Sequence, residues 1–161
     1  MTDNYPNYSI SFIGHRKVNN TEDIVNKLYV TIENLIVTEK VSNFLFGSKS
    51  EFNDICLQVV TELKKIYTII KRIYVRAEFP YINDDYKNYL LKSYDETYFP
   101  EKIISAGRAI YVERNYEMID NSKFCIFYFD KNQTTPKKSG TKISYDYAIK
   151  KNKIIFNVFD I

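Results

Sequence analysis

The sequence lacks tryptophan and has one histidine, two cysteines and four glycines among its 161 residues. Cys56 lies in a helical pattern and Cys125 in a strand pattern, so two isolated thiols and one histidine make neither a zinc site nor a disulfide framework. We therefore expect no metal and no cofactor. No apolar run approaches about 20 residues, the length of a membrane span, and residues 1–7 carry no secretory pattern. These absences favour a cytoplasmic protein without a membrane partner.

The chain also has little net charge. Its 23 Lys and Arg nearly balance its 20 Asp and Glu, which gives a net charge of +3. This excess is too small to predict nucleic-acid binding by bulk electrostatics. The alternation of aromatic and basic residues that is typical of single-strand-binding surfaces is missing as well. We therefore do not expect nucleic acid to be a partner.

Short apolar runs alternate with helical periodicities along the whole chain. Strands are predicted at residues 10–13, 44–46, 69–75, 124–129 and 154–156, and helices after Thr21, after Ser48, from about Gly107 to Asn121 and from Ser139 to about Lys150. Ser48 and Glu51 form a capping-box signature. Residues 84–98 are less regular and suit a helix followed by a short strand. The alternation predicts one α/β domain over residues 1–161, with a doubly wound, mostly parallel sheet in three αβα layers.

The four glycines lie at junctions that lead from a strand or loop into a helix. They are Gly14, Gly47, Gly107 and Gly140. In an open α/β sheet such junctions lie along the carboxyl edge, where ligands bind. Each glycine taken alone suits a tight turn, but the four together favour a ligand site.

Cationic and hydroxyl side chains adjoin these glycines. The residues concerned are His15 and Arg16, Ser48 and Lys49, Arg76, Arg108, and Lys137 and Lys138 with Ser139 and Thr141. Helix N-termini already favour an anion, so the pattern predicts a phosphate-binding rim. Solvated charge on loops is the alternative for the two lysines taken singly. His15, as a lone histidine after a strand, suits a hydrogen-bonded structural residue better than a catalyst.

Arg108 is predicted on the sheet-facing side of its helix. At 3.6 residues per turn one face carries Arg108, Tyr111, Val112, Asn115, Met118 and Ile119. A guanidinium buried at the end of this apolar face needs a partner. That partner is either a carboxylate, such as Glu51 or Glu78, or a phosphate of a ligand, and the sequence leaves both open.

Several motifs resemble a small bacterial and phage family of the SLOG superfamily, which includes the lonely-guy phosphoribohydrolases and the DNA-processing protein DprA. The motifs are Phe12-Ile13-Gly14-His15-Arg16, Phe44-Leu45-Phe46-Gly47-Ser48 with Glu51-Phe52, Gly107-Arg108-Ala109 with Glu113-Arg114-Asn115, and Ser139-Gly140-Thr141. The resemblance implies a Rossmann-like fold. The lonely-guy motif PGGxGTxxE corresponds to residues 136–144, where Lys137 and Lys138 replace two glycines and Ser144 replaces the catalytic glutamate. The resemblance therefore implies that the phosphate-binding loop is retained and the catalytic activity is lost, because serine cannot act as that carboxylate does.

Two functions follow from this resemblance. The first is a protein that senses or sequesters a nucleotide-derived signal, such as an ADP-ribose derivative or a cyclic nucleotide, in conflict between phage and host, as a homodimer or higher homo-oligomer. The alternative is a nucleotide N-glycosidic hydrolase in which Glu51 or Glu113, with Arg108, supplies the missing group. The expected ligand-binding residues are Gly14, His15, Arg16, Gly47, Ser48, Lys49, Glu51, Arg76, Gly107, Arg108, Tyr111, Asn115, Ser139, Gly140 and Thr141.

Overall fold

The computed structural model, which describes residues 5–133 and 139–160, contains one sheet of six parallel strands in the order β4-β3-β2-β1-β5-β6. The strands are β1 (Ser9–Gly14), β2 (Asn43–Phe46), β3 (Lys71–Val75), β4 (Glu96–Tyr98), β5 (Phe124–Tyr128) and β6 (Ile154–Asn157). A 3₁₀ turn, η1 (Tyr5–Tyr8), precedes β1. The predicted Rossmann-like, doubly wound α/β fold is confirmed, and the weak pattern at residues 84–98 is indeed a helix followed by a strand.

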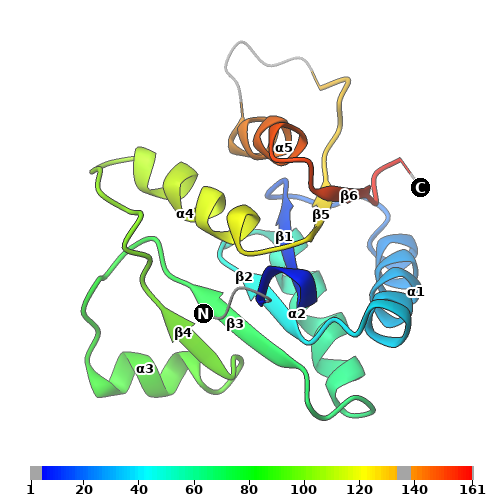
Figure 1. Cartoon of the computed structure of the whole chain (residues 1–161), viewed down its shortest axis with the longest axis horizontal. Coiled ribbons are helices and arrows are strands. Elements are labelled where there is room, and N and C mark those ends of the chain that lie inside the picture. The colour runs from blue at the N-terminus through cyan, green and yellow to red at the C-terminus, as the bar shows by residue number, and fades with distance from the viewer. Residues whose placement is uncertain (1–4, 134–138, 161) are drawn as a thin grey trace.

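Helices cover both faces of this sheet. Helices α1 (Thr21–Glu39) and α2 (Glu51–Lys64) lie on one face, and α4 (Ala109–Asp120) and α5 (Gly140–Lys150) lie on the other (Figure 1). Strand β5 supplies both cores, because Phe124 and Ile126 pack with the first layer whereas Cys125 and Phe127 pack with the second. A strand buried on both faces has an unbroken apolar sequence, which is why this strand could be predicted from the sequence.

The order of the strands reverses beside β1. The chain adds β2, β3 and β4 on one side of β1, and after α4 it crosses back to add β5 and β6 on the other side (Figure 1). Helix α3 (Asp84–Leu90) belongs to the crossover from β3 to β4. Ligands of open α/β sheets bind at such a switch point, outside the carboxyl ends of the strands.

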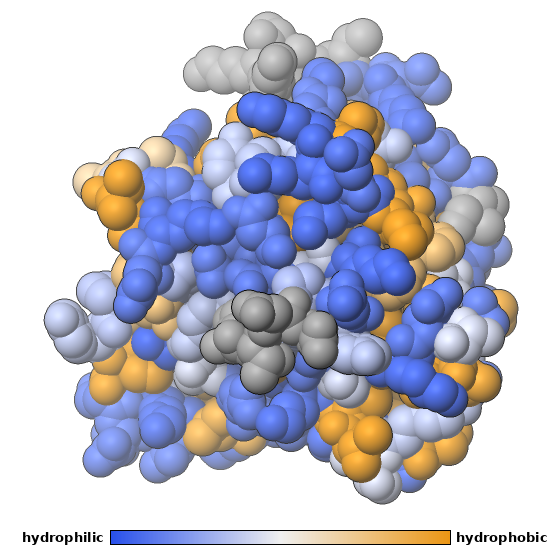
Figure 2. Space-filling view, in the orientation of Figure 1, coloured by the Kyte–Doolittle hydropathy of each residue, from blue (hydrophilic) through white to orange (hydrophobic). Residues whose placement is uncertain are grey.

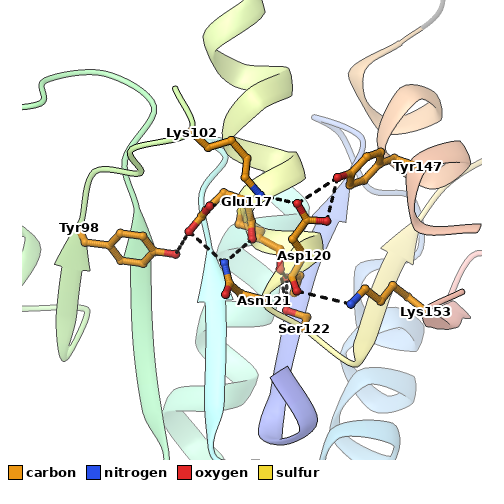
Figure 3. Close-up of polar contacts among 10 residues, drawn as sticks. Tyr98, Lys102, Glu117, Asp120, Asn121, Ser122, Tyr147 and Lys153 are labelled. Carbon is orange, nitrogen blue, oxygen red and sulfur yellow. Dashed lines mark hydrogen bonds and ion pairs between the residues drawn. The ribbon is translucent and has the colours of Figure 1, made fainter. Parts of the chain in front are cut away.

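Helix α4 is held to its neighbours by polar contacts at its C-terminal end (Figure 3). The Tyr98 hydroxyl donates to Glu117 at 3.2 Å, and the Tyr147 hydroxyl donates to Asp120 at 2.8 and 3.0 Å. Lys102 forms ion pairs with Asp120 and, at 3.6 Å, with Glu117. These contacts tie α4 to β4 on one side and to α5 on the other, and so fix which face of α4 meets the sheet.

The surface shown in Figure 2 is mainly hydrophilic, with hydrophobic residues dispersed in small groups. No helix of the described residues has the length and apolarity that crossing a membrane requires. Both cysteines are buried and free, and burial raises the pKa of each thiol. Within residues 5–133 and 139–160, no group of three or more His, Cys, Asp or Glu side chains is arranged to hold a metal ion.

Candidate functional site

A cleft of about 1040 Å³ opens at the carboxyl ends of β1, β2 and β3, beside the first turns of α4 and α5. It brings together thirteen of the fifteen residues that the sequence predicts as ligand-binding: Gly14, His15, Arg16, Gly47, Ser48, Lys49, Arg76, Arg108, Tyr111, Asn115, Ser139, Gly140 and Thr141. Glu51 and Gly107 do not line it. Lys137 and Lys138 lie outside the described residues.

A second hollow, of about 300 Å³, lies between α1 and α2. Its wall combines apolar side chains with Glu62 and Lys65, which form an ion pair with each other at 2.9 Å. Because its charges are already paired, this hollow offers little to a charged ligand. The larger cleft is therefore the candidate site.

The wall of the cleft contains a buried guanidinium, that of Arg114, whose residue is 5% exposed. One of its terminal nitrogens donates to the carbonyl oxygen of Gly47, and its Nε donates to Asn115 Oδ1 at 3.0 Å. Its carbon Cζ lies 5.7 Å from the centre of the Tyr111 ring. Burial lowers the pKa of Arg114, but an arginine stays charged at neutral pH.

Gly47 is required by this arrangement. A Cβ atom built at Gly47 would lie 2.5 Å from Cδ of Arg114 and 2.8 Å from Sδ of Met118. Both distances are far below van der Waals contact. The absence of a side chain at Gly47 thus lets the buried guanidinium approach the end of β2.

The predicted burial of Arg108 is wrong. The prediction placed Arg108 at the buried end of an apolar face, but Arg108 is exposed and Tyr111 is 40% exposed. Helix α4 begins at Ala109, and its buried residues are Arg114, Met118 and Ile119. The predicted face was rotated because Arg114, a polar residue, occupies a core-facing position. The guanidinium that needs a partner is therefore that of Arg114.

Cations outnumber carboxylates in the cleft by five to one. The cationic residues are Arg16, Lys49, Arg76, Arg108 and Arg114, and the carboxylate is that of Glu78. None of the five forms an ion pair with an acidic side chain of the described residues. Arg76 is 8% exposed, and it donates to the Phe79 carbonyl oxygen at 3.2 Å and to Thr97 Oγ1 at 3.1 Å. The cleft is thus an electropositive hollow.

Helices α2 and α5 both begin beside this hollow, but the first amide of α2, that of Glu51, donates to the Arg16 carbonyl oxygen at 2.8 Å. Ser139 caps α5 by accepting from the Lys142 amide at 3.1 Å, and Ser50 caps α2 by accepting from the Asn53 amide at 3.1 Å. Both capping residues line the cleft. The predicted capping box is wrong in its position, because Ser48 lies two residues before the cap and shares a hydrogen bond of 2.8 Å with Ser50. The first N–H groups of a helix have no intrahelical partner and favour an anion.

The carboxylates expected for hydrolysis lie elsewhere. Glu51 accepts from the Val18 amide at 2.8 Å, and Glu113 accepts from the Ser105 amide at 2.9 Å. Hydrogen bonding to Glu113 from the Ser105 side chain, and then from the Ile104 and Ser105 amides, lowers the pKa of Glu113. Neither glutamate lines the cleft. Ser144 donates to the Gly140 carbonyl oxygen at 2.8 Å and accepts from Asn115 at 3.0 Å. The side chains of Glu51, Glu113 and Ser144 are thus used in hydrogen bonds within the fold.

His15 lines the cleft with its hydrogen-bonding capacity partly used. Its Nε2 accepts from the Asp130 amide at 3.0 Å, which requires the neutral ring. Burial lowers the pKa of His15, although Asp130 acts in the opposite direction. The ring lies beside those of Tyr128 and Phe129. His15 therefore joins the β1 and β5 loops at the switch point.

Ten residues that line the cleft are outside the predicted ligand-binding set, and Arg114, Glu78, Phe79 and Tyr86 are among them. Arg114 was part of the motif that carries the resemblance, but its burial gave no signal. Glu78, Phe79 and Tyr86 line the cleft from the segment after β3, which contains no glycine to mark it.

Comparisons with known proteins give a relative of the fold only. No protein-family model matches the chain, and no curated protein matches it. Among solved structures the chain is similar to DNA processing protein A from Helicobacter pylori, described for its single-stranded DNA binding mode, with a TM-score of 0.61 and 15% identity. The alignment covers 94% of this chain and 65% of that one, so the chain spans just under two thirds of its neighbour. The likeness shows the Rossmann-like fold that the motifs predicted.

This comparison overturns the expectation that nucleic acid is not a partner. The fold is one in which a single-stranded DNA-binding protein is known. The expectation rested on a net charge of +3, which averages over the whole surface. The cleft instead concentrates five cations against one carboxylate, and local charge governs the approach of a polyanion.

Proposed function

We propose that this chain binds a phosphate-bearing nucleotide or nucleotide-derived ligand in the cationic cleft and does not cleave it. The observation that carries the proposal is the Arg114 guanidinium, which is buried, faces the cleft and has no carboxylate partner within the described residues. Burying an unpaired charge is costly, so a ligand anion would offset the cost. The planar donor set of arginine matches a phosphate, which accepts two parallel N–H bonds from it.

The neighbourhood of Arg114 supports the same ligand. The capped N-terminus of α5 offers backbone amides to phosphoryl oxygens, and Arg16 and Lys49 add charge at the same rim. Binding without cleavage is supported by Ser144, which stands where the resemblance places a catalytic glutamate and which is bonded to Gly140 and Asn115.

Calorimetry with ADP, ADP-ribose derivatives and cyclic nucleotides tests this function. Arg114→Met keeps most of the side-chain volume and removes the charge, and we expect it to weaken binding by about 1.5–3 kcal/mol. Lys71→Met is the matched control, because Lys71 begins β3 at the opposite edge of the sheet and pairs with Glu96 at 3.0 Å. The proposal fails if no member of the panel binds, or if both variants bind as the unmodified chain does. Native mass spectrometry of the same sample tests the expected homodimer.

Single-stranded DNA is a second candidate ligand, favoured by the fold of the structural neighbour together with the concentration of cations in the cleft. A gel-shift titration with a single-stranded oligonucleotide, repeated at rising salt, tests it. Competition by ADP would place the oligonucleotide in the same cleft. A shift that neither ADP nor Arg114→Met changes would place it elsewhere.

A further inference from the structure

We propose that the cleft also binds a nucleobase, with the ring of Phe79 as its stacking platform, so that the ligand lies along the sheet edge with its base beside β3 and its phosphate at α5. This inference rests on the proposed function, and it adds the class and the orientation of the ligand. It follows from the shape of the cleft, from the backbone at Phe79 and from the side chains around that ring.

The cleft is longer than a phosphate. Its wall runs from the segment after β3, past the loops after β2 and β1, to the start of α5, which follows β5. Three strand spacings separate β3 from β5, which amounts to about 14 Å. A ligand that fills both ends must carry a second group at some distance from its phosphate.

The backbone at Phe79 is held in an unusual conformation. Phe79 has φ 61°, in the left-handed region, which a bulky residue rarely adopts. Its carbonyl oxygen accepts from Nε of the buried Arg76, whose Nη1 is bonded to Thr97. Strain of this kind persists where the surroundings impose it, and it concentrates at functional sites. Here the result is a large aromatic side chain that lines the cleft and is 52% exposed.

One aromatic ring, that of Tyr86, packs against this platform. The Tyr86 ring meets that of Phe79 edge to face, with centroids 5.8 Å apart and planes at 72°. Tyr111, from the first turn of α4, donates its hydroxyl proton to Glu78, the residue before Phe79. A ring that is already ordered loses little entropy when a planar group stacks on it.

The carboxylate of the cleft lies at this end. Glu78 is the carboxylate of the cleft and adjoins Phe79, beside the cation Arg76, whereas Lys49 and Arg16 follow β2 and β1 and the N-terminus of α5 lies beyond them. A carboxylate repels a phosphate but accepts hydrogen bonds from the N–H groups on a base edge. The aromatic ring and the acceptor together suit a nucleobase.

Calorimetry with two probes, ADP and inorganic pyrophosphate, separates the two ends. The variant is Phe79→Gly, because glycine adopts positive φ without strain and the chain therefore stays folded. We expect ADP binding to weaken at least about tenfold and pyrophosphate binding to stay unchanged. The control is Tyr81→Ala, which removes a side chain from the same segment that is 92% exposed and does not line the cleft.

The outcomes distinguish this inference from the proposed function. If Phe79→Gly binds ADP as the unmodified chain does, while Arg114→Met loses both probes, the platform is wrong and the phosphate site stands. The same conclusion follows if the unmodified chain binds pyrophosphate as tightly as ADP. If the unmodified chain binds neither probe, the platform is wrong, and if it also binds no other member of the nucleotide panel, the proposed function fails as well.

Discussion

At Gly47 the backbone and a buried cation share a space that leaves no room for a side chain. Arg114 bonds to the Gly47 carbonyl oxygen and crowds the position where a Cβ would lie. The position of Arg114 therefore depends on Gly47, a residue that has no side chain.

The first prediction concerns Gly47→Ala. The added methyl group displaces Arg114 or Met118, so we expect a loss of about 1–3 kcal/mol in the free energy of unfolding and weaker ADP binding. Gly140→Ala is the control for stability, because a Cβ there meets no atom within 4 Å, and it should unfold at the same temperature or higher. Thermal unfolding of both variants checks this, and equal unfolding temperatures for Gly47→Ala and the unmodified chain would contradict it.

The second prediction concerns pH. Burial lowers the pKa of His15 below its ordinary value of 6.5, so the unfolded chain takes up this proton more readily than the folded chain. The free energy of unfolding should therefore fall as pH drops through 6.5 and level off below the folded pKa. Urea unfolding of the unmodified chain and of His15→Gln, between about pH 7.5 and about pH 5, isolates this contribution. A difference between the two that does not vary with pH would exclude it.

Among the elements, α4 shows most clearly what a sequence can and cannot predict. Its existence and approximate ends were predicted from periodicity, but its rotation was not. The reason is that Arg114 occupies a core-facing position, and its polarity moved the expected face toward Arg108. The polar contacts that fix the rotation come from β4 and α5, far away in the sequence.

The strands and the rim of the cleft were predictable for a different reason. Parallel topology alone brings the junctions after β1 and β2 and the start of α5 to one edge, so glycines and cations marked them. The segment after β3 carries no glycine, and phenylalanine is a rare choice for the left-handed conformation at Phe79. Sequence patterns therefore reached the end of the cleft proposed for the phosphate and missed the end proposed for the base.

The third prediction concerns the attachment of α4 to α5. Tyr147→Phe removes the hydroxyl that donates to Asp120 but keeps the ring stacked on Tyr116, with centroids 3.9 Å apart. We expect a loss of about 1 kcal/mol in the free energy of unfolding. Tyr116→Phe is the matched control, because its hydroxyl makes no hydrogen bond within the described residues. Urea unfolding measures both, and equal losses would show that the Asp120 contact contributes nothing specific.

For the molecule as a whole, the buried charge in the cleft serves ligand binding and does not add to the stability of the free chain. A buried charge held mainly by a carbonyl and an amide oxygen is replaceable by an apolar side chain at little cost. The free chain should then be no more stable with Arg114 than without it. A bound anionic ligand would then stabilise the chain with Arg114 more than the chain without it.

The fourth prediction tests this expectation by thermal unfolding with and without ADP. Without ligand, Arg114→Met should unfold at the same temperature as the unmodified chain or higher. With ADP at 100 times its dissociation constant, the unmodified chain should gain about 2.7 kcal/mol and the variant much less. A variant that unfolds well below the unmodified chain, yet gains equally from ADP, would assign Arg114 a purely structural role.

The exposed ring of Phe79 has an optical consequence in a chain without tryptophan. Phe79→Trp would introduce a lone indole at the cleft surface, free of background emission at its wavelength. Quenching of that emission would then report occupancy in real time, and a screen of metabolite extracts would need no labelled ligand.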